Sequence, residues 1–165
     1  MNILKYSRSA FYFIALILIC SCSDDKTIDT EKPTIDLTVA NAFPVSCDTI
    51  YFDTPFTVKM LFNDNLELGS YNIDIHNNFD QHTHSTEFEQ CEFDLVKTPV
   101  NPYIFIQDYS IPLGSSEYAA EIELTLPSSN GTSVYDEGDY HFQVTVVDKE
   151  GWAILKGFNV KLLHP

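Results

Sequence analysis

The segment Gly138-Asp-Tyr-His-Phe-Gln-Val-Thr-Val-Val-Asp148 decides the fold predicted for this chain. Its apolar side chains recur at every second position from Tyr140 to Val146, which is the period of a strand with one buried face. A second alternating run, Phe158 to Leu162, follows the turn sequence Asp148-Lys-Glu-Gly-Trp152. Gly151 suits that turn because glycine adopts positive φ without steric cost. The segment therefore predicts two strands joined by a turn.

The chain before this segment repeats the same pattern of short alternating runs separated by turn residues. The further strands that we expect cover residues 34–39, 56–62, 71–76, 91–96, 103–107 and 121–126. No stretch has the period of an amphipathic helix. Seven to eight short strands, each with one apolar face, are what two packed sheets require. The sequence therefore predicts an all-β antiparallel sandwich over residues 34–165.

The two ends of the Gly138–Asp148 segment also carry a resemblance. A Gly-x-Tyr turn opens the strand and an Asp-x-x-Gly turn closes it, which resembles the end of many immunoglobulin-like bacterial modules. This resemblance implies an immunoglobulin-like antiparallel β-sandwich of seven to eight strands, and it specifies a fold, not a function.

The N-terminus has the features of an export signal. Lys5 and Arg8 precede an apolar run over residues 11–19, which is shorter than the roughly 20 residues of a membrane-spanning helix. Ser21-Cys22 at the end of this run resembles a bacterial lipobox. We therefore expect residues 1–21 to be a lipoprotein signal peptide and Cys22 to be lipidated. An ordinary cleaved signal without a lipid is the alternative.

The residues after Cys22 predict where the protein resides. Ser23-Asp24-Asp25 resembles the export signal of surface lipoproteins in some Gram-negative bacteria. We expect a lipid anchor in the outer membrane, with the protein at the cell surface. Residues 22–33 are polar and lack periodicity, so they are expected to form a flexible tether.

The chain is strongly acidic, with a formal net charge of −15. Loss of Lys5 and Arg8 with the signal peptide leaves seven cationic and 24 acidic side chains, a charge of −17. Such a charge excludes a nucleic-acid partner, because nucleic-acid binders need a basic surface. It is compatible with solubility or with attraction of cations. The oligomeric state does not follow from the sequence.

Two cysteines, Cys47 and Cys91, remain in the predicted domain. An exported protein can form a disulfide between them. The alternatives are two buried free thiols, or participation of Cys91 in a metal site.

Three of the five histidines lie in His76-Asn-Asn-Phe-Asp80-Gln-His82-Thr-His84. Two imidazoles spaced as His82-x-His84 share one face if the backbone is extended. Three imidazoles suffice to bind zinc with an open position, or copper(II). Asp80 and Glu87 are weaker candidates, as ligands or as acceptors that orient the rings. The alternative is an ordinary polar loop.

His141 is a further weak candidate for the metal site, because it faces outward on its strand and sheet pairing could bring it close. Calcium is not expected at Asp64, Asn65, Asp148 and Glu150, which lack a recognisable calcium-loop spacing and are explained by turn chemistry.

The histidine segment from Ser70 to Glu87 resembles the hallmark of the lipoprotein family catalogued as domain of unknown function 4625. The segments Gly138-Asp-Tyr-His141-Phe and Asp148-Lys-Glu-Gly-Trp152 are similar to it as well. The resemblance extends from about Pro33 to the C-terminus and implies an immunoglobulin-like sandwich with a distinctive histidine loop. It carries no established activity.

Two functions compete on this basis. The first is a metal-binding lipoprotein that captures zinc or copper at the cell surface or transfers it, for instance to an outer-membrane transporter. The second is a glycan- or protein-binding module accessory to outer-membrane machinery, which would use exposed aromatic residues such as Trp152. We do not expect an enzyme, because catalytic motifs are missing from the sequence, although a metal-dependent hydrolase is a remote alternative.

Overall fold

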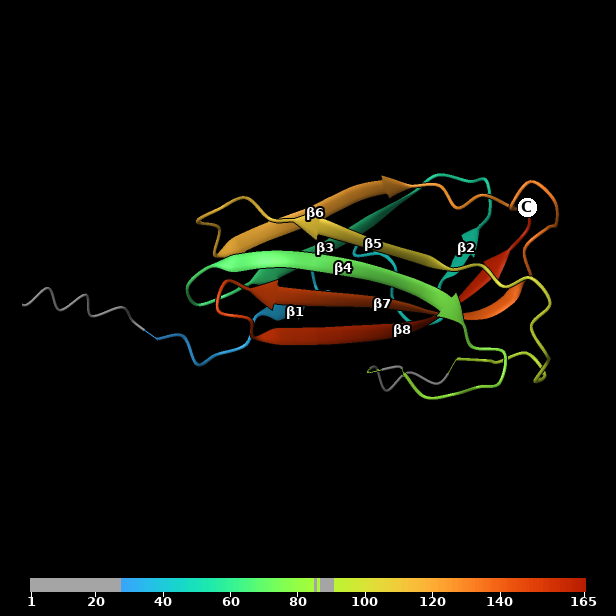
Figure 1. The fold of residues 1–165 in the computed structure, drawn as a ribbon, viewed down its shortest axis with the longest axis horizontal. Coiled ribbons are helices and arrows are strands. Elements are labelled where there is room, and N and C mark those ends of the chain that lie inside the picture. The colour runs from blue at the N-terminus through green and yellow to red at the C-terminus, as the bar shows by residue number, and fades with distance from the viewer. Residues whose placement is uncertain (1–27, 85, 87–90) are drawn as a thin grey trace, which may run out of the picture.

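The computed structural model describes residues 28–84, 86 and 91–165, so the predicted signal peptide, Cys22 and Glu87 lie outside the described part. Eight strands form two packed sheets (Figure 1). The strands are β1 (Thr34–Asp36), β2 (Thr49–Tyr51), β3 (Phe56–Asn63), β4 (Leu68–Asn77), β5 (Phe105–Ser110), β6 (Glu117–Leu124), β7 (Gly138–Asp148) and β8 (Ala153–Leu163). The all-β fold class predicted from the sequence is confirmed. Within the described residues, no helix has the length and apolar character needed to cross a membrane.

The smaller sheet has the strand order β1-β3-β6, and the larger sheet has the order β2-β8-β7-β4-β5. All neighbouring strands are antiparallel except β2 and β8, which run parallel. The alternation pattern did not reveal β2, because three residues are too short to show a period. The strand expected over residues 91–96 is wrong. These residues form an irregular, largely exposed segment between β4 and β5.

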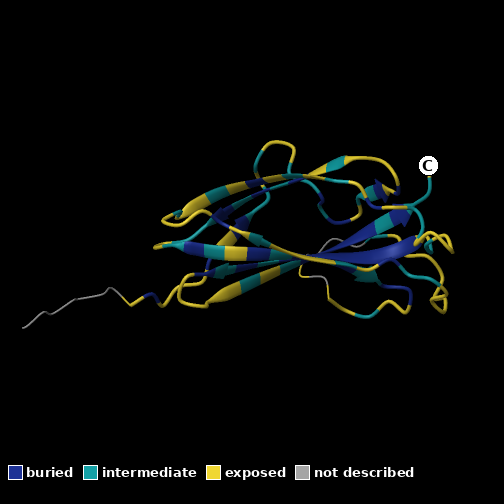
Figure 2. Ribbon diagram, turned by 45° about the horizontal axis from the view of Figure 1, so that its top comes forward, coloured by how far each residue is buried: buried dark blue, intermediate teal, exposed yellow. Residues whose placement is uncertain are grey.

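The core lies between the two sheets and is built by alternating side chains. Ile73 on β4 stands opposite Val144 on β7, and Ile75 stands opposite Phe142. All four are buried, as the period-two pattern predicts for inward positions. Figure 2 shows that buried residues are concentrated on the strands, whereas the loops are mostly intermediate or exposed.

Strand β7 is buried on its outer face as well as on its inner face. Asp139, His141 and Gln143 alternate with the core residues and nevertheless have little exposure. The cause is the described part of the segment between β4 and β5, residues 78–84, 86 and 91–104, which folds back across the outer face of the larger sheet. The carboxylate of Asp94 in this segment forms an ion pair with Lys161. The backbone N–H of Asp94 donates a hydrogen bond to the Asp139 carboxylate at 2.7 Å. We refer to these described residues as the covering loop.

A tyrosine near the start of β7 ties the covering loop to the sandwich. The Tyr140 hydroxyl donates to the carbonyl of Asp136 at 2.6 Å and accepts from the backbone N–H of Tyr103 at 3.1 Å. The first of these bonds resembles the tyrosine corner of immunoglobulin-type sandwiches. The two sheets are therefore compatible with the immunoglobulin-like topology, which stays a prediction.

Candidate metal centre

The first candidate ligand, His76, lies near the end of β4 and points to the outer face of the larger sheet. In the β4–β7 register His76 stands directly opposite His141. Their ring centroids are 5.4 Å apart. Residues directly opposite on one face of antiparallel strands are in contact range, so strand register alone brings this pair together.

A tight turn after β4 returns the chain over these two rings. The N–H of Asn78 donates to the carbonyl of Asp139 at 2.8 Å, and the N–H of Gln81 donates to the carbonyl of Asn78 at 3.1 Å. Gln81 has a φ of 58°, in the left-handed region. The chain therefore reverses direction after β4, with Gln81 in the left-handed conformation. Beyond it, the chain places His82 and His84 above the sheet.

The turn completes a cluster of three candidate ligands, His76, His82 and His84. One nitrogen atom from each ring lies within 4.8 Å of the corresponding atoms of the other two. Nitrogens bound to one tetrahedral zinc are about 3.4 Å apart, so modest side-chain rotations would bring these nitrogens to one ion. The three rings predicted as metal ligands are thus brought together by the fold, and their chemistry fits zinc or copper(II).

Two carboxylates orient the rings. Oδ1 of Asp74 lies 2.7 Å from Nδ1 of His76, and Oδ1 of Asp80 lies 2.5 Å from Nδ1 of His82. A carboxylate accepts a hydrogen bond, so it holds the proton on Nδ1 and leaves Nε2 with a free lone pair. The hydrogen bond from His82 is also the main reason why the pKa of Asp80 lies below its ordinary value.

Asp80 was expected from the sequence as an orienting acceptor, whereas Asp74 was missed. A signal for Asp74 was present, because it precedes His76 by two positions on a strand and therefore shares its outward face. Glu87, the other carboxylate candidate, lies outside the described residues.

His141 forms the floor of the cluster. Its Nε2 donates to the carbonyl of His82 at 3.1 Å, while its Nδ1 is buried and has no hydrogen-bond partner among the described residues. Burial, together with the neighbouring imidazoles, lowers the pKa of His141 to about 4. The ring is therefore neutral at pH 7, and the lone pair of its Nδ1 atom is not used in a hydrogen bond to the described residues. The sequence identified His141 only as a weaker candidate, and the strand pairing that could bring it close to the other rings is present.

The covering loop closes the histidine cluster on one side, and a hollow opens beside it on another side. A hollow of about 190 Å³ opens beside His82 and His141 and is also lined by Asn78, Phe93 and Asn159. A metal-bound water or small ligand would have room there. The fifth histidine, His164, lies elsewhere and stacks on Phe52 with ring centroids 4.9 Å apart.

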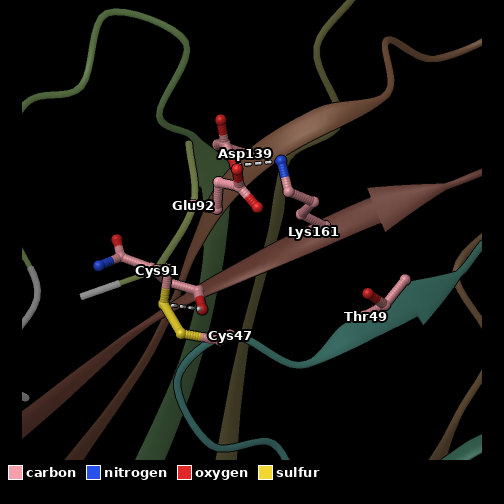
Figure 3. A pocket seen from close by; sticks show the side chains of 7 residues that line it. Cys47, Thr49, Cys91, Glu92, Asp139 and Lys161 are labelled. Atoms are coloured by element: carbon pink, nitrogen blue, oxygen red, sulfur yellow. Dashed lines mark hydrogen bonds and ion pairs between the residues drawn. A yellow bond between two sulfur atoms is a disulfide. The ribbon is translucent and has the colours of Figure 1, made fainter. Parts of the chain in front are cut away.

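The covering loop is fastened to the sheet next to this hollow. Cys47 and Cys91 form a disulfide, which rules out both free thiols and a thiolate ligand from Cys91. Figure 3 shows the disulfide beside the ion pair between Lys161 and Asp139, whose atoms are 3.0 Å apart. Together they line a second pocket of about 220 Å³. The loop that carries His82 and His84 is therefore anchored on both sides of the histidines.

These features define an all-β sandwich with an imidazole cluster between its larger sheet and a covering loop. The family model described as domain of unknown function DUF4625 matches residues 20–163, so the chain belongs to this family. No curated protein matches the chain. The family resemblance drawn from the histidine segment is thereby confirmed.

Proposed function

We propose that this protein is a surface-anchored lipoprotein that binds zinc or copper through His76, His82 and His84, for metal capture or transfer. The single observation that carries the proposal is the convergence of the three rings, with ligand nitrogens no more than 4.8 Å apart. The convergence requires the turn at Gln81, whereas an ordinary polar loop would not have to bring three histidine rings together.

The donor set favours a transition metal over calcium or magnesium. Imidazole nitrogen suits zinc and copper(II), whereas calcium and magnesium prefer oxygen ligands. Hydrogen bonds from Nδ1 to Asp74 and Asp80 are the contacts that metal-binding histidines commonly make. His141 supplies a fourth neutral nitrogen if its ring rotates away from His82.

The proposed location supports the same function. A lipid on Cys22 would hold the domain at the membrane, and the −17 charge of residues 22–165 would raise the local concentration of cations. Partners such as an outer-membrane transporter would receive the ion. No catalytic role is proposed.

The test is metal analysis of the purified protein after dialysis against trace Zn²⁺ and Cu²⁺. We expect about one equivalent of metal on the wild type, and a rise in melting temperature by mass action on the folded state. The His82→Ala/His84→Ala variant should lose both, whereas His164→Ala is the matched control outside the cluster. Absence of metal from the wild type, or an equal content in the double variant, would refute the proposal.

The competing function, a glycan- or protein-binding module, gains less support. Tyr109 and Tyr135 pack against other rings, with centroids 4.9 Å from Tyr71 and 5.0 Å from Tyr103. Tyr118 also packs against Tyr71, with centroids 6.0 Å apart. Trp152 is 42% exposed, so its ring is accessible to a partner. Metal-independent glycan binding that is lost in Trp152→Ala would favour this module instead.

A further inference from the structure

A second group of candidate ligands lies at the opposite end of the sandwich from the histidines. Asp29, Asp148 and Glu150 each contribute a carboxylate oxygen, and these oxygens lie within 4.8 Å of one another. Figure 1 shows that the N-terminal segment meets the sandwich at this end, beside the turn between β7 and β8. Asp148 is seven positions beyond His141 on β7, roughly 23 Å along an extended strand. The two sites are therefore independent.

Asp148 is held rigidly and keeps one oxygen free. Its Oδ1 accepts hydrogen bonds from the N–H groups of Gly151 and Trp152, at 2.7 and 2.8 Å. Its Oδ2 is buried and has no hydrogen-bond partner among the described residues. The residue as a whole is only 4% exposed. The turn thus fixes the carboxylate while leaving one of its two oxygens unsatisfied.

Asp29 repeats this arrangement from the N-terminal segment. Its Oδ1 accepts from the N–H of Glu31 and from Nδ2 of Asn65, both at 2.9 Å. Its Oδ2 is also buried without a hydrogen-bond partner in the described part of the chain, and the residue is 3% exposed. The indole N–H of Trp152 donates to the carbonyl of Asp29 at 3.2 Å. Asp29 is thus attached to the sandwich, although the sequence assigned it to the tether.

Two buried carboxylates with free oxygens, close to a third carboxylate, create an electrostatic problem. Burying an unpaired charge is costly, and like charges at this distance repel. A cation bound between the free oxygens removes both costs. Oxygen-only donors select a hard cation, and oxygens around one calcium ion lie up to about 5 Å apart, because each Ca–O distance is 2.3–2.6 Å.

We propose that Asp29, Asp148 and Glu150 form a calcium site that fastens the N-terminal segment to the sandwich. This site is separate from the proposed transition-metal site in both location and donor chemistry. Sequence spacing did not predict it, because Asp29 lies 119 positions before Asp148 and no contiguous calcium loop exists. Calcium binding would hold the described segment around Asp29 against the turn between β7 and β8.

Trp152 is the only tryptophan of the chain, and its indole N–H contacts Asp29, so its fluorescence reports on this site. We would titrate the purified, metal-free protein with CaCl₂. A saturable change is expected, with half-saturation at about 10⁻⁴–10⁻³ M, the range of extracellular calcium modules. An equally strong response to MgCl₂ would overturn the calcium assignment.

Variants then locate the response. Asp29→Asn and Glu150→Gln should each raise the half-saturating calcium concentration at least tenfold. Glu150 is exposed, so its replacement leaves the fold intact even if Asp29→Asn does not. Glu31→Gln removes the same charge from an exposed neighbour and should titrate like the wild type.

The His82→Ala/His84→Ala variant should also retain the calcium response, which separates this proposal from the histidine site. The proposal is overturned if the wild type shows no response up to about 10 mM calcium, well above the affinity range of such sites. It is equally overturned if Glu150→Gln titrates like the wild type.

Discussion

His76 on β4 lies directly opposite His141 on β7, and the covering loop closes over both rings. The pair belongs to the outer face of the sheet, where a two-sheet sandwich normally meets water. Covering that face converts His141 into a buried imidazole and leaves His76, His82 and His84 around it. The candidate metal centre is thus the product of one strand register and one loop.

The carboxylates beside the histidines should control metal affinity. We expect Asp80→Asn to weaken zinc binding about tenfold, because a neutral amide orients and polarises the His82 ring less well than a carboxylate does. Asp74→Asn should have a similar effect through His76. Competition titration with a chromogenic chelator measures both dissociation constants.

The matched control for these two variants is Asp108→Asn. Asp108 lies on β5 of the same sheet, where it accepts from Asn72 at 2.7 Å and has no contact with the histidines. The Asp108→Asn variant removes the same charge as the other two and should leave the zinc affinity unchanged. Equal weakening in all three variants would mean that net charge, not ring orientation, sets the affinity.

The metal-free protein should lose stability in mild acid through His141. Burial depresses the pKa of the folded-state ring to about 4, below the ordinary imidazole value of 6.5. The folded state therefore favours the neutral ring, whose stabilising effect is complete above pH 6.5 and is lost as the pH falls from 6.5 towards 4. The loss should amount to roughly 3 kcal/mol of unfolding free energy.

Urea unfolding in EDTA at pH 7, 5.5 and 4 measures this dependence. Carboxylates titrate in the same range, so the informative quantity is the difference between the wild type and His141→Gln, which lacks the ring. The variant should show a flatter decline between pH 6.5 and 4. Parallel curves for the two proteins would contradict the prediction.

The Cys47–Cys91 disulfide should stabilise both the fold and the site. It encloses 43 intervening residues. Loss of the cross-link in Cys47→Ser/Cys91→Ser should therefore lower the unfolding free energy by about 4 kcal/mol on the loop-entropy relation. Since Cys91 also anchors the covering loop, metal affinity should fall as well.

Urea denaturation and metal titration of the same sample test both parts of the disulfide prediction. A reducing agent added to the wild type should reproduce the effect and leave the double variant unchanged. Undiminished metal affinity after reduction would show that the hydrogen bonds of the covering loop suffice to hold the histidines.

The hydroxyl of Tyr140 should be important for stability in spite of its small size. Tyr140→Phe removes the acceptor of the buried Tyr103 N–H and the donor to Asp136. An unsatisfied buried donor costs about 1–3 kcal/mol, which denaturant unfolding resolves. Tyr51→Phe is the control, because Tyr51 is 43% exposed on β2. A difference below about 0.5 kcal/mol between the two variants would contradict this account.

The alternation of apolar residues along the sequence predicted the strands that have one buried face. Alternation located β3, β4, β7 and β8, because a strand with one buried face repeats its apolar side chains every two residues. The same reasoning mistook residues 91–96 for a strand, although they belong to the covering loop. Alternation in a short segment does not reveal whether a partner strand is available.

The histidine cluster was predictable in part for the same reason. His82-x-His84 and the nearby His76 are close along the chain, so a single turn suffices to bring them together. His141 and Asp29 are different, because His141 contacts His82 across 59 positions of sequence and Asp29 contacts Trp152 across 123. Such contacts depend on strand register and on loop packing, which no local pattern records.

The sequence by itself thus determined the β-rich fold class, the acidic surface and the proximity of three histidines. These follow from composition and from periodicities that act within a few residues. Only the tertiary structure decided that His141 is buried under the cluster and that Asp29 reaches Asp148. The physical reason is that each site combines segments far apart in the sequence, and their closeness is fixed by strand pairing and by packing of loops against the sheets.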